Sequence, residues 1–303
     1  VSGYIKKMNY YFKYIALILF VWVGCNHQIK DSLHIQVRNL NVIQHKLELL
    51  TVDEIIKGVN ETLTNFLPES INLNDTIYLD FIGYSDRGSY ANRDSIIIDL
   101  SDLDTITYER VNNLIAHETH HILYMKWLLK TVRNTPKDNQ QLVQSWWQYR
   151  IISEGIAQQI NFSDYPKQIQ NLYKNEDLLE DLLNFWIENQ RSISESTNPK
   201  QKFSDIQNYM WSDWSRNKLK EYLPDSEKFS PHRPTVEYYL GYHFYKEIKD
   251  NIGNEELLKV IRNPKSLLRT YNSMENKHLS IPEDIIEIWE SNYKGNTATN
   301  TLV

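Results

Sequence analysis

The sequence predicts an α+β fold that is predominantly helical, with a small sheet placed ahead of the main run of helices. Composition is the first reason: only nine glycines and nine prolines occur in 303 residues, so little of the chain is suited to irregular structure. Hydrophobic residues make up 41% of the chain, enough for a full core. Two short β-branched or alternating runs precede Leu103, and helical periodicity dominates after it.

The charge balance excludes one class of partner. The formal net charge is −6, and no block of basic residues occurs anywhere in the chain. A nucleic-acid-binding protein needs a basic face to neutralise phosphates. We therefore expect no nucleic-acid partner. The chain shows no internal repeat and no low-complexity linker, so a single mature domain is the simplest expectation.

The N-terminal segment has the pattern of an export signal. Lysines precede a short apolar run, Tyr14–Val23, which is followed by Gly24 and then by Cys25, the only cysteine in the chain. A basic region, a short apolar region and a small residue at the cleavage point are typical of a secretory signal, and the run is short for a membrane span. The segment resembles a bacterial lipoprotein signal, although Trp22 stands where an aliphatic residue is usual.

This resemblance implies that residues 1–25 form the signal region and that Cys25 becomes the lipidated first residue of the mature chain. The protein would then be lipid-anchored to the bilayer of a bacterial cell envelope, facing the periplasm or the exterior. An uncleaved signal anchor with an incidental thiol is the alternative.

The next segment begins with a polar tether, residues 26–34. Apolar residues at helical spacing predict a helix over Leu40–Leu50. Thr51 and Glu54 form a capping box that predicts the start of a second helix, which we expect to end at Pro68. The apolar face of this helix would consist of Ile55, Ile56, Val59, Leu63 and Phe66.

Two strands are predicted next, over Thr76–Gly83 and Ser95–Leu100, joined by a polar connection. Helical periodicity then continues nearly to the end of the chain. The predicted helices are Thr107–Lys130, Asn139–Asn161, Glu176–Gln190, Phe203–Leu223, Thr235–Asp250, Glu255–Arg262, Ser266–Lys277 and Pro282–Glu290. We expect the folded domain to cover residues 35–291 and a flexible tail to cover residues 292–303.

The residues His117-Glu118-Thr119-His120-His121 form an HExxH motif within the first long predicted helix. Residues four apart share a helix face, so His117 and His121 project side by side and can bind one zinc ion. Glu118 is placed to hold the metal-bound water. His120 points away from this pair. The apolar residues around the motif imply burial, which would be costly for these polar groups without a partner.

A catalytic zinc site needs a third protein ligand and one open position. Glu154 is the best candidate, because it lies on a second long helix beside the small residues Gly155 and Ala157, which allow close helix packing. Glu176 and Glu180 belong to an acidic stretch that reads as a solvated face. Another acidic residue, or a surface role for Glu154, remains the alternative.

HETHH, SEGIA and the later PTVEYYLGY together resemble the zinc-dependent peptidases of the gluzincin type, which carry an HExxH…E metal set. The resemblance covers roughly Ile77–Tyr245. It implies a zincin-like catalytic domain, one zinc ion per chain, a peptide or protein substrate, and a strand before the motif helix. Where the family often has an acidic residue one turn after the glutamate ligand, this chain has Gln158, whose amide could still accept a hydrogen bond from a ligating histidine.

The chemistry implied by this resemblance is hydrolysis of a peptide bond, with Glu118 as general base. The oxyanion usually needs a further donor from outside the motif. The segment SPHRPTVEYYLGYHFY offers Tyr238, Tyr239, His232, Arg233 and His243 as candidates. The family pattern favours Tyr238 as the donor, with His232 behind it. The other tyrosines of this helix read as core packing.

Two further readings stay open. The protein could be an inactive lipoprotein that keeps the fold as a binding or scaffold module, or a zinc hydrolase that cleaves something other than a peptide bond. The presence of Glu118 and the open coordination position favour the peptidase, because a structural zinc site normally closes with a fourth protein ligand.

Overall fold

The computed structural model describes residues 34–44, 47, 51–68, 71, 76–84, 88–102, 106–209, 219–222 and 236–294. The predicted signal region, Cys25 and His232 lie outside these residues. The chain divides into two compact units. The first comprises residues 1–62 and 72–122, and the second comprises residues 63–71 and 123–303.

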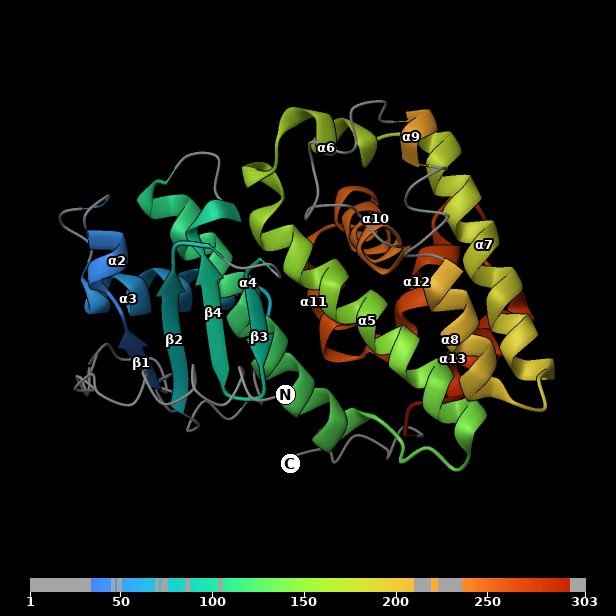
Figure 1. Ribbon diagram of the computed structural model, residues 1–303. Coiled ribbons are helices and arrows are strands. Elements are labelled where there is room, and N and C mark those ends of the chain that lie inside the picture. The colour runs from blue at the N-terminus through green and yellow to red at the C-terminus, as the bar shows by residue number, and fades with distance from the viewer. Residues whose placement is uncertain are drawn as a thin grey trace, which may run out of the picture. The chain divides into compact units, whose positions relative to one another are not determined.

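Within the described part of the first unit, four strands form a sheet in the order β1-β2-β4-β3 (Figure 1). The strands are β1 (His34–Arg38), β2 (Thr76–Ile82), β3 (Tyr90–Asn92) and β4 (Ser95–Asp99). β1, β2 and β4 are parallel, and β3 pairs antiparallel with β4. The predominantly helical α+β fold, with a small sheet before the motif helix, is therefore confirmed.

The alternating pattern of the predicted strands determines which face of the sheet is buried. Ile77, Leu79 and Phe81 of β2 are fully buried, as expected from their spacing. Leu79 pairs with Ile96 and Phe81 with Ile98, so the same face continues across β4. The predicted polar connection contains β3, a strand of three residues, and β1 begins at the last residue of the predicted tether.

The first unit also contains α2 (Asn41–Gln44) and α3 (Val52–Leu63). The predicted capping box at the start of α3 is present, because Thr51 Oγ1 accepts from the Glu54 amide at 3.2 Å and Glu54 Oε2 accepts from the Thr51 amide at 2.9 Å. The Thr51 hydroxyl also donates to Glu54 Oε2 at 2.8 Å, and this hydrogen bond together with that from the Thr51 amide lowers the pKa of Glu54. The helix ends at Leu63, five residues before Pro68, so the proline does not end it.

α4 (Tyr108–Trp127) is the helix that carries the HExxH motif, and one π-helical turn, Leu128–Val132, follows it. Its residues up to Ile122 belong to the first unit and its last turn to the second. In the second unit, the segment after this turn pairs with the end of the described chain. The Asn134 amide donates to the Asn292 carbonyl at 3.0 Å, and the Lys294 amide donates to the Val132 carbonyl at 2.9 Å.

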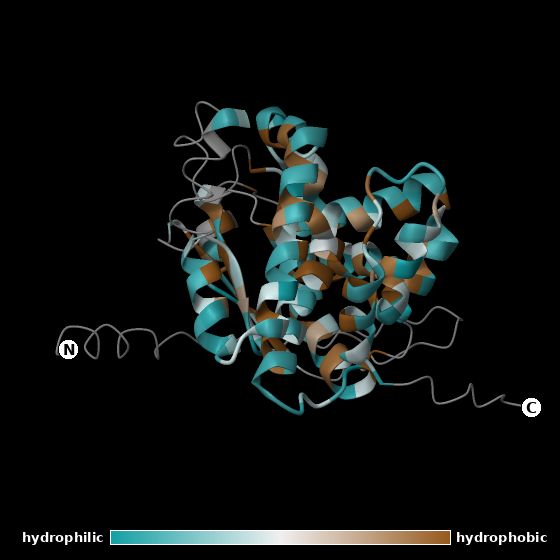
Figure 2. Cartoon of the chain, turned by 90° about the vertical axis from the view of Figure 1, so that its right-hand side faces the viewer, coloured by the Kyte–Doolittle hydropathy of each residue, from teal (hydrophilic) through white to brown (hydrophobic). Residues whose placement is uncertain are grey.

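The rest of the second unit is helical, and most of its helices carry both apolar and polar residues along their length (Figure 2). Its α-helices are α5 (Asn139–Asn161), α6 (Lys167–Leu172), α7 (Glu176–Glu195), α8 (Pro199–Tyr209), α9 (Leu219–Tyr222), α10 (Val236–Asn251), α11 (Asn254–Arg262), α12 (Leu267–Ser273) and α13 (Glu283–Ser291). α6 was not predicted. The expected helix Phe203–Leu223 corresponds to α8 and α9. Residues 210–218, between these two helices, lie outside the described set. Among the described residues, no helix combines the length and the apolar character that crossing a membrane requires.

α5 and α10 are the central pair of the second unit (Figure 1). They touch through glycine. A Cβ atom added to Gly155 would lie 2.4 Å from the carbonyl carbon of Gly241, and one added to Gly241 would lie 2.2 Å from the Ile151 carbonyl oxygen. Neither position has room for a side chain, so the two backbones are in direct contact. The close packing expected at Gly155 is confirmed, and Gly241 is its partner.

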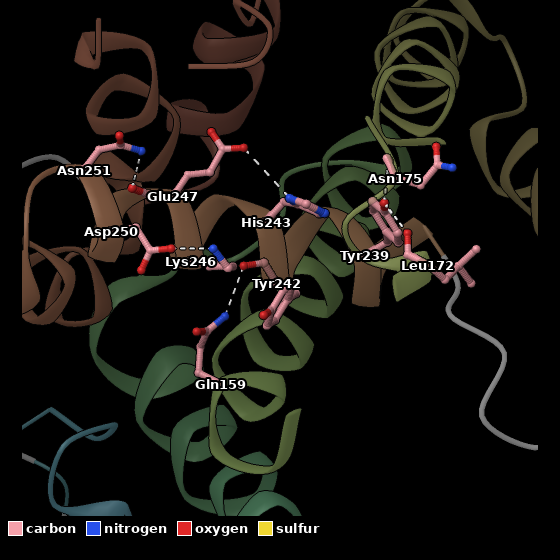
Figure 3. A network of polar contacts seen from close by, with 10 residues as sticks. All are labelled: Gln159, Leu172, Asn175, Tyr239, Tyr242, His243, Lys246, Glu247, Asp250 and Asn251. Atoms are coloured by element: carbon pink, nitrogen blue, oxygen red, sulfur yellow. Dashed lines mark hydrogen bonds and ion pairs between the residues drawn. The ribbon is translucent and has the colours of Figure 1, made fainter. Parts of the chain in front are cut away.

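Polar contacts fix α10 against its neighbours (Figure 3). The Tyr239 hydroxyl is within 2.8 Å of the carbonyls of both Leu172 and Asn175, at the connection between α6 and α7. Gln159 of α5 donates to the Tyr242 carbonyl at 3.1 Å. The rings of Tyr239 and Tyr242 are buried, so these tyrosines pack in the core, as predicted for most tyrosines of this helix.

Candidate metal centre

α4 brings the two motif histidines together. His117 and Glu118 are 5% and 7% exposed, and His121 is partly exposed. The Nε2 atoms of His117 and His121 lie 3.1 Å apart, with the ring planes at 79°. Two nitrogens bound to one tetrahedral zinc ion at about 2.0–2.1 Å would lie about 3.3 Å apart. The imidazoles therefore already have nearly the spacing that a shared metal ion requires.

The third predicted ligand belongs to the same group of atoms. Among the described residues, one set of histidine, cysteine and acidic side chains has ligand atoms close enough to hold a metal ion, and it consists of His117, His121 and Glu154. One ligand atom from each lies within 4.8 Å of the other two. Glu154 is only 4% exposed. Arg150 and Trp146 lie on the same face of α5, about one and two turns before Glu154.

The donor set fits zinc. Two imidazole nitrogens and one carboxylate oxygen are ligands that zinc accepts, and three protein ligands leave a tetrahedral position open for water or substrate. Glu118 neighbours His117 in the chain and lies outside the ligand set, as the HExxH pattern predicts for a residue that acts on the water. The arrangement can support metal-assisted hydrolysis.

Arg150 is part of the surroundings of Glu154 and was not predicted from the sequence. Its Nη1 lies 3.2 Å from Glu154 Oε1, and its guanidinium carbon lies 5.7 Å from the ring centres of both Trp146 and Tyr238. Burial alone would lower the pKa of Arg150, but the charges of Glu154 and other neighbours raise it above its ordinary value. The i, i+4 spacing of Arg150 and Glu154 is the pattern that could have indicated this pair.

One comparison with known proteins also indicates zinc. A family described as "Putative zinc dependent peptidase (DUF5700)" matches residues 24–279. The chain belongs to this zinc peptidase family. The resemblance to zinc-dependent peptidases that the motifs indicated is thus confirmed. No curated protein and no solved structure matches the chain.

The structure places the remaining predicted residues of this zinc peptidase family member as follows. Tyr238 is partly exposed in the first turn of α10, beside Arg150. Gln158 is fully buried, and neither atom of its amide has a hydrogen-bond partner among the described residues, so its contact with a ligating histidine stays a prediction. His120 is fully buried and outside the metal group, with its ring centre 6.2 Å from that of His121.

Two other candidates for the oxyanion donor have different roles in the structure. Tyr239 is buried, and its hydroxyl contacts two backbone carbonyls. His243 faces Glu247, with Nδ1 3.9 Å from the carboxylate (Figure 3). His243 and Glu247 line a separate cavity of about 160 Å³, which none of the predicted metal ligands borders. Among the oxyanion-donor candidates within the described residues, Tyr238 is therefore the one that contacts Arg150, the ion-pair partner of Glu154.

Proposed function

We propose that the protein is a zinc-dependent peptidase in which His117, His121 and Glu154 hold one zinc ion and Glu118 is the general base. The observation that carries the proposal is the 3.1 Å approach of the two imidazole nitrogens, together with a buried carboxylate in the same ligand group. Membership of the zinc peptidase family supports it. The substrate would be a peptide or protein, and the reaction would be hydrolysis of its peptide bond.

Zinc, when bound, would polarise the scissile carbonyl and increase the acidity of a water molecule in the open position. Glu118 would accept a proton from the attacking water and deliver it to the leaving amine. Tyr238 can donate a hydrogen bond from its phenol to the developing oxyanion. The side chains of His117, Glu118 and Glu154 are nearly buried, which limits competition from bulk water for these contacts.

We also propose that the mature protein is tethered to a membrane of the cell envelope through lipidated Cys25. Support comes from the sequence alone: a basic region, a short apolar run and a small residue directly before the single cysteine. The bilayer would then be the second partner of the protein, beside its peptide substrate. A nucleic-acid partner does not fit the charge distribution.

The test compares the parent with Glu118→Gln and His117→Ala. Zinc content is measured on protein purified without chelators, and hydrolysis is measured with a peptide library. Glu118→Gln keeps the size of the side chain but removes the proton acceptor, so it should retain zinc and lose at least about 100-fold in turnover. His117→Ala should lose zinc and activity together. Equal hydrolysis by the parent and Glu118→Gln would refute the mechanism.

A zinc-loaded parent that cleaves no peptide would favour the alternative of an inactive binding or scaffold lipoprotein. Zinc retained by His117→Ala at parental level would show that the metal lies elsewhere. A folded parent that binds no zinc would refute the proposal as a whole.

A further inference from the structure

Arg150 occupies a position between the metal ligand Glu154 and two aromatic rings, all within the second unit. Its guanidinium is 3.2 Å from Glu154 Oε1 and 5.7 Å from the ring centres of Trp146 and Tyr238. The side chain of Arg150 is 28% exposed and that of Glu154 is 5% exposed. Solvent therefore screens this ion pair much less than it screens an ion pair on the open surface.

A carboxylate as deeply buried as that of Glu154 needs compensation for its charge. A buried charge is costly unless it is paired and hydrogen-bonded. The Arg150 guanidinium compensates the charge at one carboxylate oxygen, and it also restricts the rotation of the side chain. Both effects prepare Glu154 for a metal before the metal binds.

The same guanidinium links Glu154 to Tyr238 of α10. Arg150 and Glu154 are one helical turn apart on α5, and Tyr238 lies in the first turn of α10. The backbone contact between Gly155 and Gly241 fixes the spacing of these two helices. A cation over a tyrosine ring is attracted by the ring electrons, and this attraction favours one placement of the phenol.

We propose that Arg150 is a positioning residue of the metal centre. Its ion pair holds the Glu154 carboxylate in one orientation for the metal, and its contact with the Tyr238 ring restricts the placement of the phenol. This inference rests on the proposed function, because it assigns Arg150 a role toward the metal ligand and the oxyanion donor named there.

The guanidinium charge also repels a bound dication, and this repulsion opposes the orienting effect. Removal of a side chain that contacts a metal ligand usually costs about 10- to 100-fold in metal affinity. That range is the net effect of losing the whole side chain, so it already includes such opposing terms. We therefore expect orientation of Glu154 to outweigh repulsion.

The first test measures zinc affinity of the full chain by competition with a chromophoric chelator. Arg150→Gln removes the charge and should weaken zinc binding about 10- to 100-fold. Arg150→Lys keeps a cation within reach of Glu154 and should lie between the parent and Arg150→Gln. Arg191→Gln is the matched control, because Arg191 pairs with exposed Asp284 in the same unit and should leave the affinity unchanged.

A second readout separates positioning of Tyr238 from general damage. Lysine lacks the planar guanidinium, so Arg150→Lys should loosen the phenol. The loss of kcat caused by Tyr238→Phe should then be smaller in the Arg150→Lys background than in the parent, which a double-mutant cycle measures. Full additivity of the two losses would contradict this part of the proposal.

The outcomes distinguish this inference from the proposed function. A zinc-binding parent whose Arg150→Gln variant binds zinc as tightly, or more tightly, overturns the role of Arg150 and leaves the metal set intact. A folded parent without zinc overturns the proposed function instead. Circular dichroism verifies folding of each variant. If Arg150→Gln does not fold, zinc affinity is measured instead on Arg150→Met, which keeps the apolar stem of the side chain and removes its charge.

Discussion

Substitution of Gly155 by alanine tests how closely the two central helices pack. The added Cβ would lie 2.4 to 2.5 Å from three backbone atoms of Gly241, about 1 Å short of ordinary van der Waals contact. Backbone cannot turn aside as a flexible side chain can, so α5 and α10 must separate. A gap of 0.5–1 Å loses roughly a quarter to a half of the dispersion energy of each contact across it.

The expected loss of stability follows from two opposing terms. Alanine is favoured over glycine inside a helix by about 1 kcal/mol. Overpacking typically costs about 1–3 kcal/mol, and the upper part of this range applies because only backbone atoms meet the new group. Gly155→Ala should therefore lower the free energy of unfolding by about 1–2 kcal/mol.

Urea unfolding followed by circular dichroism measures this change. Gly83→Ala is the matched control, because no atom lies within 4 Å of a Cβ added there, and it should stay within about 0.5 kcal/mol of the parent. The reasoning is wrong if Gly155→Ala unfolds at the same urea concentration as the parent. It is equally wrong if Gly155→Ala and Gly83→Ala destabilise the protein alike.

Three further predictions concern the site, the anchor and the first unit. Tyr238→Phe should reduce turnover by about 10-fold or more and leave zinc content unchanged, because a phenol that only stabilises the oxyanion does not hold the metal. Steady-state kinetics and zinc analysis measure both quantities, and a kcat equal to that of the parent would exclude Tyr238 as the donor. Cys25→Ser should yield protein that carries no lipid and is no longer found in the membrane fraction, which mass spectrometry and cell fractionation measure. A Cys25→Ser protein that still carries lipid would rule out Cys25 as the attachment point. Thr51→Ala should destabilise the protein by about 0.5–2 kcal/mol, because the Glu54 amide loses its hydrogen-bond acceptor. Thermal unfolding measures this change, and an unchanged midpoint temperature would contradict a stabilising role for the capping box.

Much of the fold could be predicted because its elements follow simple periodicities. The bounds of α5, Asn139–Asn161, agree with the prediction, and the predicted alternation of β2 matches its buried residues. Short elements were missed: β3 has three residues and α6 has six, which is less than two turns of a helix. A pattern needs several repeats before it stands out from chance.

The grouping of His117, His121 and Glu154 could be predicted because their spacing is local or lies on a strongly patterned helix. Arg150 was missed because its importance depends on what surrounds it. Its pair with Glu154 lies within one helix, but its contact with Tyr238 depends on the rotation of α5 against α10. That rotation is fixed by the contact of Gly155 and Gly241, which are 86 residues apart in the chain (241 minus 155).

The pairing of residues 132–134 with residues 292–294 has a consequence for the order of folding during synthesis. Hydrogen bonds between Val132 and Lys294, and between Asn134 and Asn292, close a loop that includes every helix from α5 to α13. A growing chain cannot form these bonds until Lys294 has left the ribosome, and long-range contacts of this kind form slowly. The second unit would thus close only after the segment that contains Lys294 has been made.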